Sequence, residues 1–203
     1  AKLIGWDQRQ GTGSQKGTLR RGFGIGSCNW GAFPAPAEAE VVISRDGSIE
    51  ARTGTQDIGT GQRTIMGIIA AERLGVPLEM VNVQIGSSSL PEGPGSGGSV
   101  TAPNTSVAMI DASLKARDLL LKGVAERAGG DASEFTIVNG EIHRHGTKAM
   151  TWKEACGRMG VESINARGRN DQKARDAHFG KGHSHGVQFV EVEVGIAGLL
   201  VVA

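Results

Sequence analysis

The sequence lacks a long apolar run and has almost no net charge. Its 203 residues include 22 Lys and Arg against 21 Asp and Glu, a formal net charge of +1. This balance argues against a strongly electrostatic nucleic-acid binder. No run of about 18 apolar residues is present and no charged-then-apolar leader opens the chain, so neither a membrane span nor a signal peptide is expected. The expected location is the cytoplasm, and the periplasm is the alternative for the intact enzyme.

Cysteine and recognisable catalytic motifs are also scarce. Cys28 and Cys156 lie far apart and in no CxxC pattern, so they fit free thiols in a reducing compartment better than a disulfide or a metal site. Nucleophile elbows, a Ser-His-Asp order and HExxH are missing, and no catalytic residue is assigned. Glu191 and Glu193 share one face of an expected strand. We interpret them as solvent-exposed charges on a strand. The less favoured alternative is a pair of carboxylates that act together in acid–base chemistry.

The histidines offer a weak indication of a metal site. His183 and His185 lie two residues apart, and His143 and His145 repeat the spacing. Residues at i and i+2 share a face of a strand, which allows chelation. No Cys, Asp or Glu completes either pair at a recognisable spacing, so no metal ligand is predicted.

Glycine is the residue in excess, with 32 in the chain. The glycines cluster between periodic segments, which favours close backbone approach to a ligand or tight packing over disorder. The stretch GTQDIGTGQRT, residues 54–64, follows a hairpin with its turn at Asp46-Gly47 and leads into a helix that ends at Gly75. N–H groups at such a helix start can hold phosphate or another anion, with a purely structural turn as an equal alternative.

A second segment of the same kind follows. Residues 78–86 alternate as a half-buried strand, and residues 87–104 form a long loop. A helix is expected over 105–129, with Asn104 or Thr105 as its cap. Two glycine-rich loops that each lead into a helix favour a shared phosphorylated ligand.

The remaining chain predicts smaller elements. A hairpin turns at Asn139-Gly140, a short helix lies near 151–159, residues 166–186 form a polar segment, and 187–194 form a strand. The prediction is an α+β fold, with a connector over 1–19 and one partial domain over 20–203.

Four motifs together carry a family resemblance. RRGFGIGSCNWG, the segment from VVISRDG to VNVQIG, LPEGPGSGGSVT and HGVQFVEVEV resemble the molybdopterin-binding large subunit of the xanthine dehydrogenase/aldehyde oxidoreductase family. Their order and spacing match the family over about residues 20–128 and again near 184–194. The resemblance implies a fragment of the molybdenum-cofactor-binding domain, in which helices follow glycine-rich cofactor loops.

The resemblance also implies a cofactor site. The cofactor would be molybdopterin or molybdopterin cytosine dinucleotide with molybdenum. The first glycine-rich loop would meet the pterin and its phosphates, and the second would approach from the other side. Thr60 stands where many relatives have Gln. The implied cofactor-binding residues are Gln56, Asp57, Ile58, Gly59, Thr60, Gly61, Gly98, Ser99, Val100 and Thr101.

The implied activity is that of a molybdenum hydroxylase. Such an enzyme oxidises a small molecule, an aldehyde or an aromatic heterocycle, with water as the oxygen source. Its electrons pass to iron–sulfur and flavin subunits or domains, and neither nucleic acid nor a membrane is an expected partner. The family's catalytic Glu lies near the end of a much longer subunit, and nothing here matches that motif. The chain is therefore expected to be an inactive fragment of an active enzyme. The alternative is a non-catalytic isolated or apo domain without the cofactor.

Overall fold

The computed structural model describes residues 2–11, 13–31, 33–171 and 183–195. The chain divides into two compact units, the first made of residues 1–31 and 182–203 and the second of residues 32–181. The connector over 1–19 stays a prediction. The predicted polar segment, 166–186, lies partly outside the described residues.

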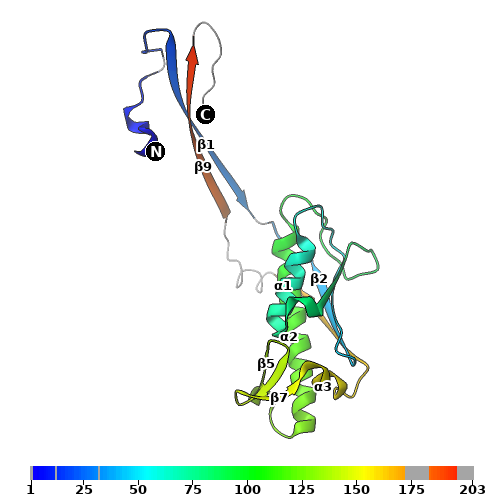
Figure 1. Ribbon diagram of the computed structural model, residues 1–203. Coiled ribbons are helices and arrows are strands. Elements are labelled where there is room, and N and C mark those ends of the chain that lie inside the picture. The colour runs from blue at the N-terminus through cyan, green and yellow to red at the C-terminus, as the bar shows by residue number, and fades with distance from the viewer. Residues whose placement is uncertain (1, 12, 32, 172–182, 196–203) are drawn as a thin grey trace. The chain divides into compact units, whose positions relative to one another are not determined.

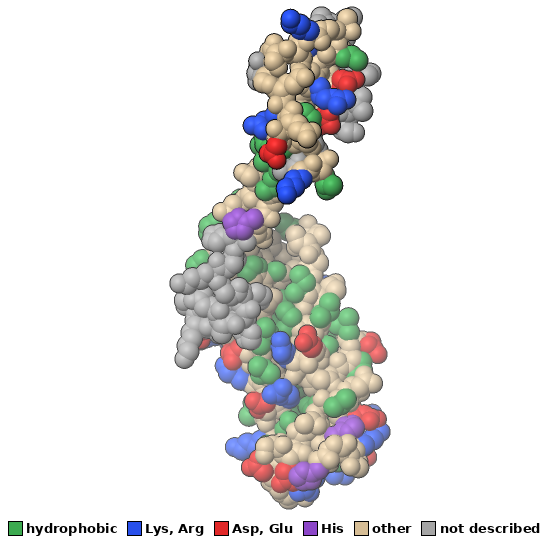
Figure 2. All heavy atoms as spheres, turned by 90° about the vertical axis from the view of Figure 1, so that its left-hand side faces the viewer, with side chains coloured by type: hydrophobic (Ala, Val, Ile, Leu, Met, Phe, Trp, Pro, Cys, Tyr) green, Lys and Arg blue, Asp and Glu red, His purple; other side chains and the backbone are tan. Residues whose placement is uncertain are grey.

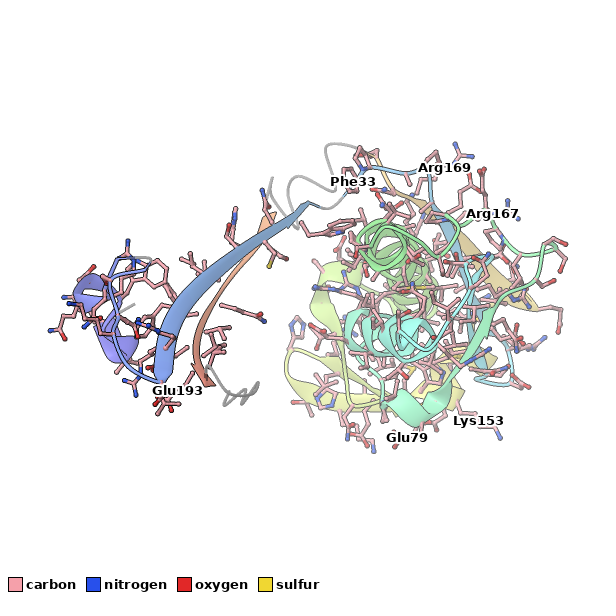
Figure 3. The ribbon with its side chains drawn as sticks, turned by 90° about the horizontal axis from the view of Figure 1, so that it is seen from above. Phe33, Glu79, Lys153, Arg167, Arg169 and Glu193 are labelled. Atoms are coloured by element: carbon pink, nitrogen blue, oxygen red, sulfur yellow. The ribbon has the colours of Figure 1, made fainter. Side chains whose placement is uncertain are left out.

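The first unit is a two-stranded antiparallel ribbon (Figure 1). Strand β1 spans Leu19–Gly31, and β9 spans His183–Gly195. Two short 3-10 turns, Lys2–Ile4 (η1) and Trp6–Gln8 (η2), precede β1. The predicted strand over 187–194 is confirmed, and β9 is longer than expected. The ribbon pairs Arg21 with Glu193, which is labelled in Figure 3, and the Arg21 guanidinium lies 2.9 Å from Glu191 and 3.5 Å from Glu193. The two carboxylates are thus ion-paired with Arg21.

The second unit is built on a four-stranded mixed sheet in the order β4-β3-β2-β8. Strands β2 and β3 are antiparallel and form the predicted hairpin, whose turn is closed by Ser48 N–H donating to the Asp46 carboxylate at 2.9 Å. Strands β3 and β4 are parallel, joined by helix α1 and the 3-10 turn η3. The bounds are Glu38–Ser44 (β2), Ile49–Thr53 (β3), Gln62–Leu74 (α1), Leu78–Met80 (η3), Val81–Ile85 (β4) and Ser163–Arg169 (β8).

Helices α1 and α2 cover one face of this sheet, and α2 spans Thr101–Ala128 (Figure 1). The core between them is apolar and fully buried, with Ile43 from the sheet and Met66, Met109 and Leu120 from the helices. Burying an apolar side chain of this size stabilises the folded state by about 1.5–3 kcal/mol.

Two sequence predictions are wrong in this unit. Helix α2 begins at Thr101 rather than at residue 105. Residues 163–169 form strand β8, although residues from 166 on were expected to be a polar segment. In β8 the small residues Ala166 and Gly168 face α2, which passes so close that a side chain at Gly168 would meet the Ala108 backbone.

The opposite face of the sheet is charged and self-neutralised. Arg167 and Arg169 lie on the side away from the helices (Figure 3). Arg167 pairs with Glu40 at 3.3 Å and Arg169 with Glu38 at 2.9 Å, while Arg52 reaches Glu40 at 3.2 Å. This face therefore presents paired charges of both signs to solvent.

A three-stranded sheet, β5-β6-β7, packs near the end of α2 with the short helix α3. The predicted turn at Asn139-Gly140 and the predicted helix are confirmed, while β7 was not predicted. Trp152 at the start of α3 donates its indole N–H to the Gly47 carbonyl at 2.9 Å. Figure 2 shows side chains of both charges mixed around this end of the unit. The bounds are Ala132–Glu134 (η4), Phe135–Val138 (β5), Glu141–Arg144 (β6), Thr147–Thr151 (β7) and Trp152–Gly157 (α3).

Candidate functional site

Two glycine-rich loops leave the same edge of the four-stranded sheet. The first glycine loop, residues 54–61, follows β3, and the second glycine loop, residues 86–100, follows β4. Because β3 and β4 run parallel and end on the paired residues Thr53 and Ile85, both loops start side by side. The topology therefore brings together two segments that the sequence separates by a whole helix.

Hydrogen bonds join the two loops along their length. Gly54 N–H donates to Pro91 O at 2.6 Å, and the Thr55 hydroxyl donates to Pro94 O at 3.0 Å. Further out, Ser96 N–H donates to the Gln56 side-chain oxygen at 3.0 Å, and the Ser96 hydroxyl donates to Gln56 O at 2.6 Å. The two loops therefore lie side by side, as a shared ligand would require, and the shared site itself stays a prediction.

The glycines of these loops are of two kinds. A Cβ at Gly54 would lie 2.8 Å from Pro91 O, and one at Gly93 would lie 2.6 Å from Thr55 N, so both glycines allow the loops to touch. At Gly59 and Gly98 an added Cβ would meet no described atom within 4 Å, although both residues have positive φ. Gly54 and Gly93 therefore let the two loops pack against each other, while Gly59 and Gly98 face open space.

A pocket of about 310 Å³ opens between the ends of the loops. Larger hollows of about 890 and 470 Å³ lie in the first unit, and one of about 480 Å³ lies between α1, α2 and β5. The smaller pocket differs from them in having buried polar side chains in its wall, Gln62 and Thr101, which are 1% and 8% exposed. Its lining residues are Ile58, Thr60, Gln62, Ser96, Gly97, Gly98, Ser99, Thr101, Ala102 and Pro103.

The pocket contains half of the residues implied by the family resemblance. Ile58, Thr60, Gly98, Ser99 and Thr101 line it. The other five implied residues lie in the same loops but outside the lining. They are Gln56, Asp57, Gly59, Gly61 and Val100.

The start of α1 is already neutralised by the chain itself. The Asp57 carboxylate accepts N–H groups from Gly59 at 2.9 Å, Gly61 at 3.2 Å and Arg63 at 3.0 Å. These bonds, the one from Arg63 first, hold the pKa of Asp57 below its usual value. The sequence left an external anion and a purely structural turn as equal alternatives at this helix start. The structure favours the structural turn, because an internal carboxylate uses three of the N–H groups.

The start of α2 is different. Val100 is the N-cap, and within the described chain no side chain caps the helix. Asn104, predicted as a cap, lies inside the helix and is fully buried. Its amide N–H groups donate to Phe33 O at 2.8 Å and Val100 O at 2.6 Å, and its oxygen accepts Ala35 N–H at 3.1 Å. Asn104 thus fixes the helix start against a neighbouring segment and leaves the N–H groups of the first turn without a side-chain acceptor.

Sequence reasoning missed Gln62, which is the buried polar residue shared by α1 and the pocket. Its Nε2 donates to Thr105 Oγ1 at 2.5 Å, and the Thr105 hydroxyl donates to Thr101 O at 2.7 Å. This chain of bonds ties the start of α1 to the first turn of α2. In the sequence, Gln62 is an ordinary polar residue at a helix start. Only its burial in the structure distinguishes it as a candidate site residue.

The remaining candidates are not among the residues that line this pocket. Cys28 is exposed and Cys156 is buried, both as free thiols, and burial raises the pKa of Cys156 to about 12. His143 lies 3.7 Å from Glu141 and His145 lies 3.2 Å from Glu134, each at the three-stranded sheet. No group of three His, Cys, Asp or Glu suited to a metal ion occurs among the described residues. Within that same part of the chain, no helix is both long and apolar enough to cross a membrane.

Known proteins share sequence similarity with this chain. A family model for the molybdopterin cofactor-binding domain matches residues 1–198. The chain is 33% identical over 198 residues to the aldehyde oxidoreductase molybdenum-binding subunit PaoC of Escherichia coli K12, covering 96% of this chain and 26% of that subunit. It is 28% identical over 149 residues to the putative xanthine dehydrogenase molybdenum-binding subunit XdhA of the same strain, covering 70% of this chain and 20% of that subunit.

Solved structures share the fold at lower identity. Quinoline 2-oxidoreductase from Pseudomonas putida 86 matches 88% of this chain and 25% of its own, with a TM-score of 0.72 and 20% identity. Reconstituted CO dehydrogenase from Oligotropha carboxidovorans matches 88% of this chain and 24% of its own, with a TM-score of 0.72 and 21% identity. The chain spans about a quarter of the length of the relatives it matches first. The α+β fold and the match over residues 1–198 place the chain in the molybdopterin cofactor-binding domain family of the molybdenum-dependent oxidoreductases.

Proposed function

We propose that this chain forms one wall of the cofactor site in a molybdenum hydroxylase that oxidises an aldehyde or an aromatic heterocycle. The observation that carries the proposal is the pocket of about 310 Å³, where two glycine loops meet and where Gly98 faces open space. Small-molecule sites measure about 300–1,000 Å³, so this pocket suits one part of an extended cofactor, with the rest held by other parts of the enzyme.

The residues present fit an anionic pterin cofactor. Thr60, Ser96, Ser99 and Thr101 bring hydroxyl groups to the pocket, and the bare start of α2 adds backbone N–H groups. Lys and Arg are missing from the described lining, so neutral donors would hold the phosphate. Because Asp57 occupies the start of α1, we place the anionic end of the cofactor at α2.

When bound, the cofactor supplies two-electron oxidation with water as the oxygen source. The residues of this chain bind and orient it. Ile58, Ala102 and Pro103 offer apolar contact to a ring face, while the polar groups of the second glycine loop fix its edge. The proposed cofactor is molybdopterin or molybdopterin cytosine dinucleotide. The dinucleotide is longer, and its additional nucleotide would reach beyond this pocket. Electrons would leave through iron–sulfur and flavin partners, and the proposed location is the cytoplasm.

A second candidate function is a non-catalytic module that keeps the fold without the chemistry. It is favoured by the composition of the pocket, since no Asp or Glu stands in its described lining to act as a base. Molybdenum-dependent turnover of aldehydes by the 203-residue chain alone would contradict both this candidate and our expectation that the chain by itself is inactive.

The test of the cofactor site is Gly98→Val in the complete enzyme, with Gly146→Val as its matched control. Both glycines have positive φ, 56° and 79°, and both face open space, so a side chain costs about 1–3 kcal/mol of backbone strain at either place. Only Gly98 lines the pocket. We expect molybdenum per protein to fall in Gly98→Val and to stay normal in Gly146→Val, with unchanged circular dichroism in both. Normal molybdenum content in Gly98→Val would remove the second glycine loop from the site.

A further inference from the structure

Gln62 lines the pocket although it is only 1% exposed. Its amide orientation follows from its neighbours. The Thr105 hydroxyl has one proton, which it donates to Thr101 O at 2.7 Å. The Thr105 oxygen must therefore accept from Gln62, and the group on Gln62 that faces α2 is the NH₂ group. The Gln62 oxygen, Oε1, points elsewhere.

No described residue donates a hydrogen bond to Gln62 Oε1. The buried side-chain oxygen that lacks a partner among the described residues is Asn170 Oδ1, so Gln62 Oε1 is not sealed inside the protein. Since this pocket is the hollow that Gln62 lines, the pocket is the place from which a bound molecule could reach Oε1. Buried polar side chains in folded proteins are almost always paired, and an acceptor left open in a pocket wall marks a place for a donor.

The surroundings of Gln62 favour a donor as well. The Asp57 carboxylate accepts N–H groups from Gly61 and Arg63, the residues on either side of Gln62 in the chain. The negative charge of Asp57 therefore offsets the positive end of α1 at this wall. A ligand group that presents an oxygen acceptor here would face another acceptor, while an N–H group would be matched.

We infer that Gln62 Oε1 accepts a hydrogen bond from an N–H group on the edge of a flat heterocycle, so that the pocket selects a donor edge over an acceptor edge. The apolar surface of Ile58, which is 67% exposed, and of Pro103 stands beside it for the ring face. The choice of a pterin as that heterocycle rests on the proposed function. Gln62 is thus a specificity-determining residue of the cofactor site.

The experiment compares two probes of nearly equal shape on the full 203-residue chain. Pterin carries an amino donor at the ring position where lumazine carries an oxygen acceptor. The wild-type chain should bind pterin about tenfold more tightly than lumazine, as expected when one pocket hydrogen bond is exchanged for an unmade one. Gln62→Leu should bind the two probes about equally. Gln84→Leu, the same change at an exposed position of β4, should keep the wild-type ratio.

The ratio of the two dissociation constants is the readout, because a loss of folded protein lowers both affinities alike. Thermal unfolding of each variant checks that it is folded at the assay temperature. Equal binding of the probes by the wild type, no pterin binding, or a preserved preference in Gln62→Leu would each overturn the inference. Molybdenum loss in Gly98→Val would still support the proposed function in those cases. Conversely, a Gln62-dependent preference with normal molybdenum in Gly98→Val would refute only the proposed function.

Discussion

The two glycine loops leave neighbouring parallel strands but end in different ways. The first glycine loop closes on itself, since Asp57 turns back to accept N–H groups at the start of α1. The second glycine loop enters α2 through Val100 without a side-chain cap in the described structure. Similar glycine-rich sequences therefore give one helix start that is self-satisfied and one that is available. The difference teaches that a glycine loop before a helix is an anion site only when no nearby carboxylate reaches it.

The largest expected effect comes from separating the loops. In Gly93→Ala the new Cβ would lie 2.6 Å from Thr55 N and 3.0 Å from Thr55 Cβ, so the backbones must move apart. We expect a loss of about 1–3 kcal/mol in the free energy of unfolding, the usual cost of overpacking. Gly97→Ala is the matched control, because its Cβ meets nothing within 4 Å. Urea unfolding of both variants measures the effect, and equal stabilities would show that the loops are not packed as described.

A smaller effect is expected at the self-satisfied helix start. Asp57→Ala removes the acceptor for Gly59, Gly61 and Arg63, and it should lower the midpoint of thermal unfolding at neutral pH. Since the folded pKa of Asp57 lies below 3.8, its contribution is complete above that value and is lost as the pH falls through the folded pKa.

The pH profile supplies the control for Asp57. The difference in unfolding midpoint between wild type and Asp57→Ala should be constant from about pH 5 to 8 and should shrink below about pH 3.8. A difference that instead grows on acidification would mean that the carboxylate does not cap α1.

The smallest expected effect is the binding of inorganic phosphate, and it sharpens the comparison most directly. In the wild type, added phosphate should shift the amide resonances of Ser99, Thr101 and Ala102 and leave those of Gly59 and Gly61 in place. Asp57→Asn removes the negative charge, so the amides of the first glycine loop should then respond as well. A wild-type response confined to the first glycine loop would reverse our placement of the anion.

Local signals in the sequence predict much of the fold. The Asp46-Gly47 and Asn139-Gly140 turns carry their own turn chemistry, and Gly75 ends α1 in the left-handed conformation that the sequence predicts. The start of α2 was misplaced, because Thr101–Asn104 contains Pro103 and resembles the preceding loop. Contacts of Asn104 with a distant segment stabilise the helix there. Strand β8 was missed for a similar reason, since α2 supplies the burial of its small residues.

The candidate site was predictable only in part. Glycine spacing and the family resemblance indicated both loops, and the structure brings them to one pocket. Two features depend on three-dimensional contacts and left no signal in the sequence. These are the return of Asp57 onto its own helix and the buried amide of Gln62 with its open oxygen.

The parallel pairing of β3 and β4 has a consequence for how such a site can change. Thr53 and Ile85 fix the roots of both loops within one sheet register, so residues inserted beyond Ser96 would lengthen a loop tip without moving its root. Each doubling of loop length costs only about 0.6 kcal/mol in closure entropy. A change in the length of the second glycine loop can therefore reshape the pocket while the sheet stays the same. The same sheet can in this way support pockets for different ligands.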